Sequence, residues 1–230
     1  MVDRFSRLGL LIGADGLQRL SRARVLVAGL GGVGSFCAEA LVRCGVGTIG
    51  AMDSDNSEPS NLNRQLFALT STLGKSKVDS FTQRARDINP DVSVEPLPLY
   101  LNRESFDSVD FSRYDIVADC IDSLVPKLNL ILYCLQNEIP IVASTGAGFK
   151  TDPTQVRFGS IWDTRNDALA QRMRKKLRQW GYRNTDFTVV YSLEKRDQQN
   201  KGPGDIGSIV TVTGTFGLTI ASRIIDWLLQ

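Results

Sequence analysis

Short apolar runs alternate with amphipathic segments along most of this 230-residue chain. The first repeat of that pattern is an apolar run at 25–28, a glycine turn, an amphipathic stretch to about residue 44, and a second apolar run at about 48–52. Short apolar runs indicate buried strands, and hydrophobic residues on one face at helical spacing indicate a helix. We therefore expect a βαβ unit with two parallel strands over this segment.

The same alternation continues to about residue 150. The elements it predicts are a helix at 76–88, a strand at 92–97, a short helix near 103–109, a strand at 116–120, a helix over 124–135 and a strand at 140–144. Strands that alternate with helices are typical of α/β proteins. The fold class expected here is thus a doubly wound, mostly parallel, Rossmann-like sheet with helices on both faces.

The two ends of the chain depart from this alternation, and we expect one domain, residues 1–230, with three parts. Residues 1–22 read as an N-terminal helical arm, residues 23–150 as the Rossmann-like core, and residues 151–230 as a C-terminal α/β elaboration. The elements expected in the elaboration are a strand at 155–161, a helix at 167–180, a strand at 187–192 and a helix at 208–229. A charged, glycine-containing stretch near 194–205 is predicted to be a mobile loop.

The turn after the first strand has the glycine spacing of a nucleotide-binding site. Gly29 permits the turn, Gly31 lets the backbone approach a phosphate, and Gly34 lets the helix pack closely on the strand. The N–H groups at a helix start attract phosphate. Asp53 ends the next strand, where an acid commonly accepts hydrogen bonds from ribose. A glycine-rich turn without a ligand is the alternative, but the order of strand, turn, helix and distal acid favours nucleotide binding.

The polar residues that follow favour ATP over a dinucleotide. Asn61, Asn63 and Arg64 come after the second strand, and Lys77 opens the next helix. Arg64 and Lys77 can converge on a polyphosphate where a dinucleotide needs apolar room for nicotinamide. Asp122 follows the fourth strand and can hold Mg²⁺ against phosphates. A triphosphate, a metal and two cations suggest attack on the α-phosphate, which is adenylation of a carboxylate.

Each of these residues also has a simpler interpretation. Arg64 and Lys77 could be ordinary surface charges, and Asp122 could cap the following helix, a role compatible with metal binding.

Cys37, Cys44, Cys120 and Cys134 form no CxxC pair, and the chain has no histidine, so no structural zinc is expected.

The overall composition sets few limits on function. A hydrophobic content of 42% with 23% charged residues is ordinary for a globular protein, and the net charge of +2 permits an anionic partner without requiring one. We find no secretory leader or membrane span in the sequence pattern, so a soluble, cytoplasmic protein with free thiols is expected.

Five motifs in order carry a family resemblance: GLGGVG at 29–34, DSD at 53–55, SNLNRQ at 60–65, GKSK at 74–77 and DCIDS at 119–123. Together they resemble the E1-like (ubiquitin-activating, ThiF-type) adenylating superfamily, over essentially the whole chain. The ATP-binding residues that the resemblance implies are Gly29, Gly31, Gly32, Gly34, Asp53, Asp55, Asn61, Asn63, Arg64, Lys77, Asp122 and Ser123. It also implies catalysis by Arg64, Lys77 and Asp122, with Asp122 on Mg²⁺. Arg7 would reach the γ-phosphate of a neighbouring subunit, which implies a homodimer.

The second half of the chain indicates the branch. Residues 150–230 contain no cysteine, which excludes a thioester mechanism that uses a cysteine of this half of the chain. The segments that resemble the tRNA threonylcarbamoyladenosine dehydratases are STGAGFKTDPTQV at 144–156 and GSIVTVTGTFGLTIAS at 207–222, and Ser123 also suits that branch. The implied reaction is ATP-dependent cyclisation of N6-threonylcarbamoyladenosine in tRNA through an acyl-adenylate. Two alternatives stay open. One is adenylation of the C-terminus of a small ubiquitin-like or sulfur-carrier protein, and the other is a non-catalytic or NAD-binding protein.

A basic helix face in the elaboration bears on the partner. Its cations are Arg172, Arg174, Lys175, Lys176 and Arg178. Such a face is by default simply solvated, but five cations without an acid among them also suit a tRNA backbone. The opposite face carries Met173, Leu177 and Trp180, so Trp180 is expected in the core.

Overall fold

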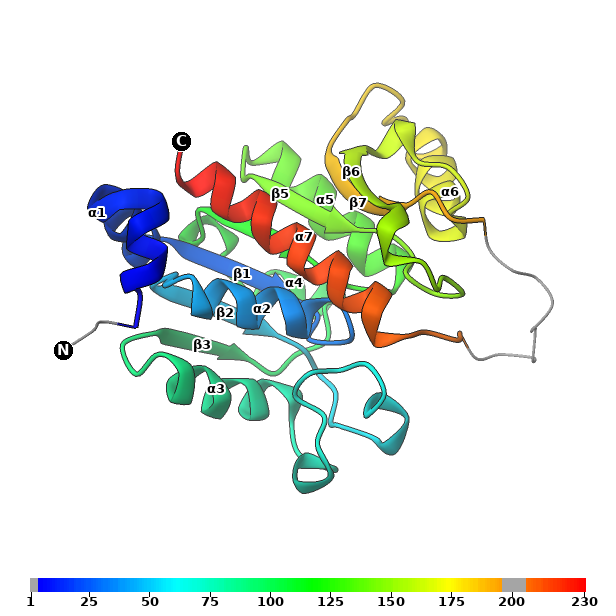
Figure 1. The fold of residues 1–230 in the computed structure, drawn as a ribbon. Coiled ribbons are helices and arrows are strands. Elements are labelled where there is room, and N and C mark those ends of the chain that lie inside the picture. Colours follow the sequence, from blue (N-terminus) through cyan, green and yellow to red (C-terminus); the bar gives the residue numbers. More distant parts are fainter. Residues whose placement is uncertain (1–3, 196–205) are drawn as a thin grey trace.

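Seven strands form one sheet in the computed structural model, which describes residues 4–195 and 206–230 (Figure 1). The strands are β1 (Arg24–Ala28), β2 (Thr48–Met52), β3 (Ser93–Leu97), β4 (Ile116–Asp119), β5 (Ile141–Ser144), β6 (Val156–Ser160) and β7 (Thr188–Ser192). Their order across the sheet is β3-β2-β1-β4-β5-β7-β6. Every neighbouring pair is parallel except β6 with β7. The predicted doubly wound, mostly parallel sheet is confirmed.

Helices cover both faces of this sheet. They are α1 (Ser6–Arg22), α2 (Gly34–Arg43), α3 (Lys77–Ile88), α4 (Arg103–Phe106), α5 (Leu124–Gln136), α6 (Ala168–Gln179) and α7 (Val210–Leu228). Short 3-10 turns occur at Pro59–Asn61, Thr70–Thr72, Phe111–Arg113, Pro153–Gln155 and Ile161–Asp163. No helix among the described residues is long and apolar enough to cross a membrane.

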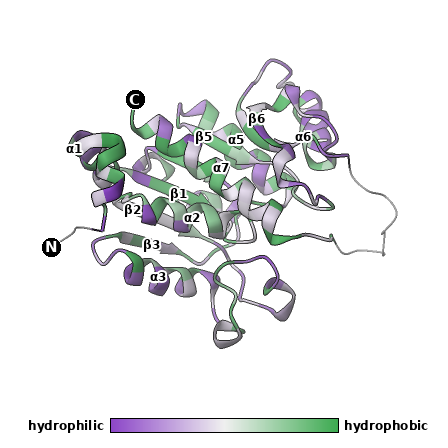
Figure 2. Ribbon diagram, viewed as in Figure 1, coloured by the Kyte–Doolittle hydropathy of each residue, from purple (hydrophilic) through white to green (hydrophobic). Residues whose placement is uncertain are grey.

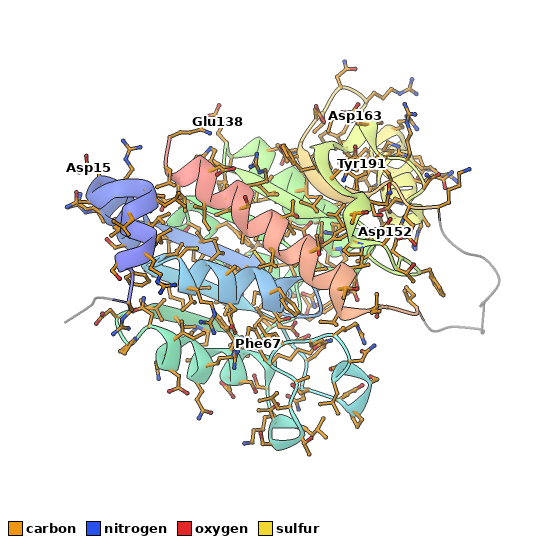
Figure 3. All side chains as sticks on the ribbon, in the orientation of Figure 1. Asp15, Phe67, Glu138, Asp152, Asp163 and Tyr191 are labelled. Carbon is orange, nitrogen blue, oxygen red and sulfur yellow. The ribbon has the colours of Figure 1, made fainter. Side chains whose placement is uncertain are left out.

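The side chains of β1 divide the interior into two layers. Val25 and Val27 belong to the core formed with α2, α3 and α7, whereas Leu26 and Ala28 belong to the core formed with α5 and α6. This alternation follows from the two-residue period of a strand. Phe67 fills part of the first layer, with its ring 5.2 Å from that of Phe81 (Figure 3). Hydrophilic residues gather on α6 and on the outer side of α3 (Figure 2).

The N-terminal arm is helical, as expected, but it is broken at Gly13. Gly13 has φ 73° and ψ 176°, so α1 consists of two helical pieces joined at that residue. Glycine adopts positive φ without the steric cost that a side chain would bring. Arg19 Nη1 donates to the carbonyl oxygen of Leu229 at 2.7 Å, which ties the arm to the end of α7. The arm thus lies at the amino ends of the strands, where β1 begins (Figure 1).

The C-terminal part extends the same sheet and supports the glycine turn. Strand β7 lies between β5 and β6, and α7 packs across α2. A Cβ on Gly217 would lie 2.2 Å from the carbonyl oxygen of Val33, so glycine is needed for this close approach. The mobile loop predicted near 194–205 falls almost wholly on residues 196–205, which lie outside the described residues. That prediction and the three-part domain division stay predictions.

Candidate active site

A cavity of about 920 Å³ lies at the carboxyl ends of the parallel strands. Its walls come from the turns after β1, β2, β4 and β5, from the segment after β3, and from the start of α6. The strand order reverses between β1 and β4, and ligands of doubly wound proteins bind at such switch points. Ten of the predicted ATP-binding residues line this cavity: Gly29, Gly31, Gly32, Asp53, Asp55, Asn61, Arg64, Lys77, Asp122 and Ser123.

The glycine turn is shaped as its spacing predicts. Gly29 has φ +90°, and a Cβ on Gly34 would lie 1.7 Å from the carbonyl oxygen of Gly29, so a side chain at Gly34 cannot be accommodated without moving the turn. A Cβ on Gly31 meets only the Gln65 amide nitrogen, at 3.9 Å. Within the described residues, the N–H groups of Gly31 and Gly32 have no hydrogen-bond partner. These free donors line the cavity at the start of α2, an arrangement that suits phosphate.

Asp53 couples the glycine turn to the segment after β2. One carboxylate oxygen accepts from the N–H of Leu30 at 2.7 Å, and the other accepts from the N–H of Asp55 at 2.8 Å. A carboxylate offers about four acceptor positions. Asp53 can therefore still accept hydrogen bonds from a ribose while it holds the turn.

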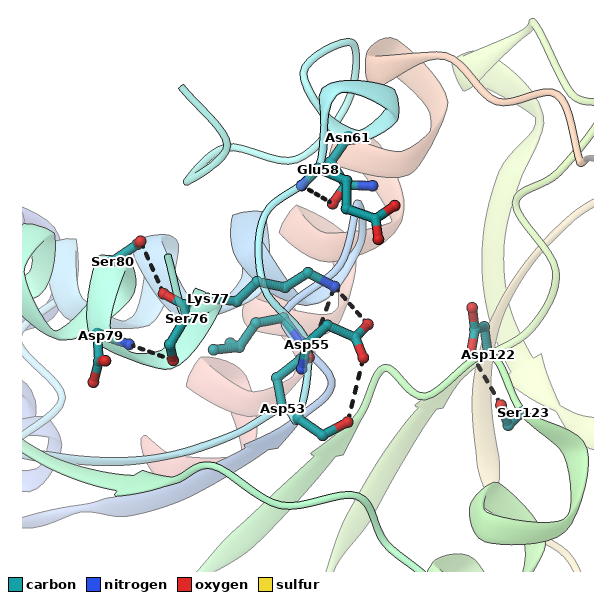
Figure 4. Close-up of polar contacts among 12 residues, drawn as sticks. Asp53, Asp55, Glu58, Asn61, Ser76, Lys77, Asp79, Ser80, Asp122 and Ser123 are labelled. Carbon is teal, nitrogen blue, oxygen red and sulfur yellow. Dashed lines mark hydrogen bonds and ion pairs between the residues drawn. The ribbon is translucent and has the colours of Figure 1, made fainter. Parts of the chain in front are cut away.

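Lys77 lies between two acids at the start of α3. Its Nζ is 2.8 Å from Asp55 Oδ2 and 3.7 Å from Asp53 Oδ1, and its side chain is only 7% exposed (Figure 4). Ser76 caps the helix by accepting from the N–H of Asp79. The hydrogen bond from Lys77 holds the pKa of the Asp55 carboxyl below its ordinary value. The ammonium group is thus fixed on the cavity wall.

The segment SNLNRQ contributes residues with different roles. Arg64 Nη1 donates to the carbonyl oxygen of Ser60 at 2.8 Å and to Asn63 Oδ1 at 3.0 Å, which leaves other guanidinium donors for a ligand. Asn63 does not line the cavity: its amide nitrogen donates to the carbonyl oxygen of Ser208. Gln65 lines the cavity wall and is 8% exposed, and its Oε1 has no partner among the described residues. Sequence reasoning missed Gln65, although it lies inside that motif.

Asp122 is exposed on the other side of the cavity from Lys77 (Figure 4). Ser123 Oγ donates to Asp122 Oδ1 at 3.3 Å. In the part of the chain that the structure describes, no group of three or more histidine, cysteine or acidic residues could hold a metal ion. A single carboxylate fits Mg²⁺ at an ATP site, because phosphates and water supply the other ligands.

A fully buried ion pair shapes the turn that carries Asp122. Lys127 Nζ is 2.6 Å from Asp119 Oδ2, and both side chains are 0% exposed. Burial raises the pKa of the Asp119 carboxyl, and Lys127 opposes this by favouring the charged form. The other oxygen of Asp119 accepts from the N–H of Ile121 at 3.1 Å. Asp119 therefore acts on the turn structure and not on a ligand.

Two further walls of the cavity were not predicted. Residues 99–101, after β3, give no sequence signal, whereas the glycine-containing loop at 144–148 was noted only as a family motif. That loop is bound to α6 through Asp167, which caps the helix by accepting from the N–H of Ala170 at 2.8 Å. The second oxygen of Asp167 accepts from Thr145 Oγ1 at 2.6 Å. The elaboration thus closes one side of the cavity.

The basic face of α6 is divided by its contacts. Arg172 lines the cavity, Arg174 donates to Ile161 O at 3.2 Å and to Thr164 Oγ1, and Lys175 is exposed. Lys176 lies over the Trp180 ring at 5.2 Å, and Arg178 lies over the Trp162 ring at 5.0 Å. The prediction that Trp180 is buried was wrong: it is 37% exposed, because it follows the last turn of α6 and precedes Gly181, where φ is +90°.

Arg7 lies away from this cavity. It is exposed on α1, at the opposite edge of the sheet (Figure 1). Leu10 and Leu11, on the same arm, are 90% and 82% exposed. A role for Arg7 in phosphate binding therefore needs a second copy of the chain.

The chain is similar to proteins of known name and structure. The ThiF family matches residues 5–230. The tRNA threonylcarbamoyladenosine dehydratase of Bacillus subtilis (strain 168) is 43% identical over 84% of this chain and 76% of its own length. The Haemophilus influenzae enzyme of the same name is 34% identical over 99% of this chain and 94% of its own length. The crystal structure of Escherichia coli tRNA N6-threonylcarbamoyladenosine dehydratase in complex with ATP matches with a TM-score of 0.89 and 35% identity, covering 99% of this chain and 94% of that one.

Proposed function

This chain belongs to the ThiF family, and we propose that it is an ATP-dependent tRNA threonylcarbamoyladenosine dehydratase. It cyclises N6-threonylcarbamoyladenosine in tRNA with loss of one water, and it converts ATP to AMP and pyrophosphate. One observation carries the proposal: a single cavity holds the free N–H groups of the glycine turn, Lys77 and Asp122, in a chain 35% identical to a dehydratase solved with ATP.

ATP binding follows from the residues around the turn after β1. The N–H groups of Gly31 and Gly32 donate to phosphate oxygens, and Asp53 accepts from the ribose hydroxyls. Lys77 and Arg64 bring positive charge to the same polyphosphate. Because these groups are already held in place, they stabilise the charge that develops on phosphate without reorganising.

Adenylation is the first chemical step. An oxygen of the threonyl carboxylate attacks the α-phosphorus, a new P–O bond forms, and the bond to pyrophosphate breaks. Lys77 and Arg64 stabilise the negative charge that moves onto the departing phosphates. Mg²⁺, held by Asp122 and phosphate oxygens, would act as a Lewis acid on the phosphates.

Cyclisation is the second step. A nucleophilic atom of the same modification attacks the activated carbonyl carbon, the bond to AMP breaks, and the nucleophile loses its proton. The carboxylate oxygen leaves with AMP, so the nucleoside loses one water overall. The nucleophile is tethered at high effective concentration, which agrees with the lack of cysteine in residues 150–230.

The partners of the reaction are also part of the proposal. The cations of α6 outside the cavity, such as Lys175, contact the tRNA backbone, and a homodimer brings Arg7 of the second copy to the γ-phosphate. The exposed Leu10 and Leu11 beside Arg7 support an interface at α1. The expected location is the cytoplasm, where tRNA is available.

The release of AMP and pyrophosphate tests the function. Purified protein with Mg-ATP is expected to release both only when tRNA that carries threonylcarbamoyladenosine is added, and not with the same tRNA made without the modification. Release that requires a small protein with a free C-terminus, and not tRNA, would instead support a carrier-activating enzyme. Lys77→Met, in the presence of modified tRNA, should abolish release while the protein stays folded.

A further inference from the structure

Arg172 occupies a place that its neighbours on α6 do not share. It is the one cation of the basic face that lines the cavity, whereas Arg174, Lys175, Lys176 and Arg178 do not. Its side chain is exposed, and among the described residues no hydrogen bond, ion pair or ring contact involves it. All five donors of its guanidinium group are therefore available to a ligand.

The position of Arg172 is fixed by packing at the start of α6. Asp167 is 6% exposed and holds Thr145 and Gly146 through one oxygen, at 2.6 and 3.0 Å. Met173 is fully buried in the core that α6 shares with α5. These contacts hold the start of α6, and with it Arg172, against the loop after β5.

The start of α6 is bound to the loop after β5, and β5 lies two strands away from β1 and its glycine turn. Neighbouring strands are about 4.8 Å apart, so the loops after β1 and β5 are separated by about 10 Å. Lys77 and Arg64 serve the nucleotide side of the cavity. Arg172 is thus placed for the second reactant and not for ATP.

That reactant presents a carboxylate to a triphosphate, and two anions repel at short distance. We propose that Arg172 binds the threonyl carboxylate of the modified nucleotide and orients it toward the α-phosphate. This role rests on the proposed function. Arginine pairs with carboxylate through two parallel hydrogen bonds. After adenylation the acyl group has lost its charge, so the hold of Arg172 on it weakens and the chain of the modification is free to cyclise.

Affinity for two matched tRNAs tests the role of Arg172. One tRNA carries threonylcarbamoyladenosine, and the other has the same sequence without it; binding is measured without ATP for wild type, Arg172→Gln and Lys175→Gln. A hydrogen-bonded charge pair is worth about 10- to 100-fold in affinity. We expect Arg172→Gln to lower affinity for the modified tRNA by this factor and to leave affinity for the unmodified tRNA almost unchanged.

Lys175→Gln is the matched control, because Lys175 is exposed on the same helix and does not line the cavity. It should lower the affinity for both tRNAs by the same factor. Arg172→Lys should recover part of the preference for the modified tRNA, because lysine keeps the charge but lacks the planar guanidinium group. Binding of ATP, equal in all variants, verifies that they are folded.

Three outcomes would overturn the inference. Equal weakening of both tRNAs by Arg172→Gln would make Arg172 a backbone contact, and no change would remove it from binding altogether. Wild-type protein that shows no preference for the modified tRNA, yet dehydrates it with ATP, would also contradict the inference and leave the proposed function intact. Wild-type protein that fails to dehydrate the modified tRNA would instead refute the proposed function.

Discussion

Removing Lys127 should destabilise the whole protein far more than removing a surface cation. Lys127 and Asp119 have fully buried side chains, with Nζ and Oδ2 2.6 Å apart. The substitution Lys127→Met fills a similar volume but leaves the Asp119 carboxylate buried without its partner. Breaking a buried pair in this way costs about 3–5 kcal/mol. For a chain of this size that corresponds to a fall in Tm of about 6–20 °C.

Guanidinium unfolding followed by circular dichroism measures this change. Arg223→Gln is the matched control: Arg223 pairs with Asp226 at the surface, and such exposed pairs are worth about 0.2–1 kcal/mol. The double variant Asp119→Asn/Lys127→Met should recover part of the loss, because no charge is then left buried and the amide oxygen still accepts from Ile121. A loss for Lys127→Met no larger than that for Arg223→Gln would refute the account of this pair.

Three further predictions concern the cavity. The substitution Gly34→Ala should lower the Tm and also lower ATP affinity at least about tenfold, because its Cβ would lie 1.7 Å from the Gly29 carbonyl oxygen. The substitution Gly31→Ala should lower ATP affinity alone, because its Cβ meets nothing nearer than 3.9 Å. Loss of Tm in both variants would contradict this assignment. Lys77 lowers the pKa of Asp55, so their contact stabilises the protein at pH values above the ordinary pKa of Asp55. The substitution Asp55→Asn should therefore cost stability at pH 6 and progressively less below about pH 4. A cost that does not change with pH in denaturant titrations would contradict the ion pair. Burial raises the pKa of the Cys134 thiol to about 12, so iodoacetamide at pH 8 should leave Cys134 unlabelled. It should label Cys120, which lines the cavity, and bound ATP should protect Cys120 from labelling. If peptide mass analysis shows that ATP does not change the labelling of Cys120, this residue does not lie at the ATP site.

The sequence predicts local features of this molecule better than its spatial groupings. The strands and helices of the core follow from periodicity, and the turn from Gly29 to Gly34 follows from glycine spacing, because both depend on residues close in the chain. The break at Gly13 is harder to predict, since an isolated glycine within a helical pattern is tolerated at a cost of about 1 kcal/mol and does not by itself indicate a break.

Three of the wrong or incomplete predictions involve contacts between distant segments. Asn63 donates to Ser208, 145 residues away, in place of lining the cavity. The basic face of α6 looks uniform in sequence, but the contact of the start of α6 with the loop after β5 brings Arg172 to the cavity and leaves Lys175 in solvent. Gln65 lies in a recognised motif, yet only the fold shows that its Oε1 is buried beside the glycine turn.

Nucleoside mass analysis of tRNA tests the central claim most directly. The tRNA comes from cells that cannot cyclise threonylcarbamoyladenosine and is incubated with the purified protein and Mg-ATP, with Asp122→Ala as the variant. The account predicts that this nucleoside loses the mass of one water, that the loss requires ATP, and that Asp122→Ala abolishes it. An unchanged nucleoside after complete incubation with folded, ATP-binding protein would contradict the assignment of this chain as a dehydratase.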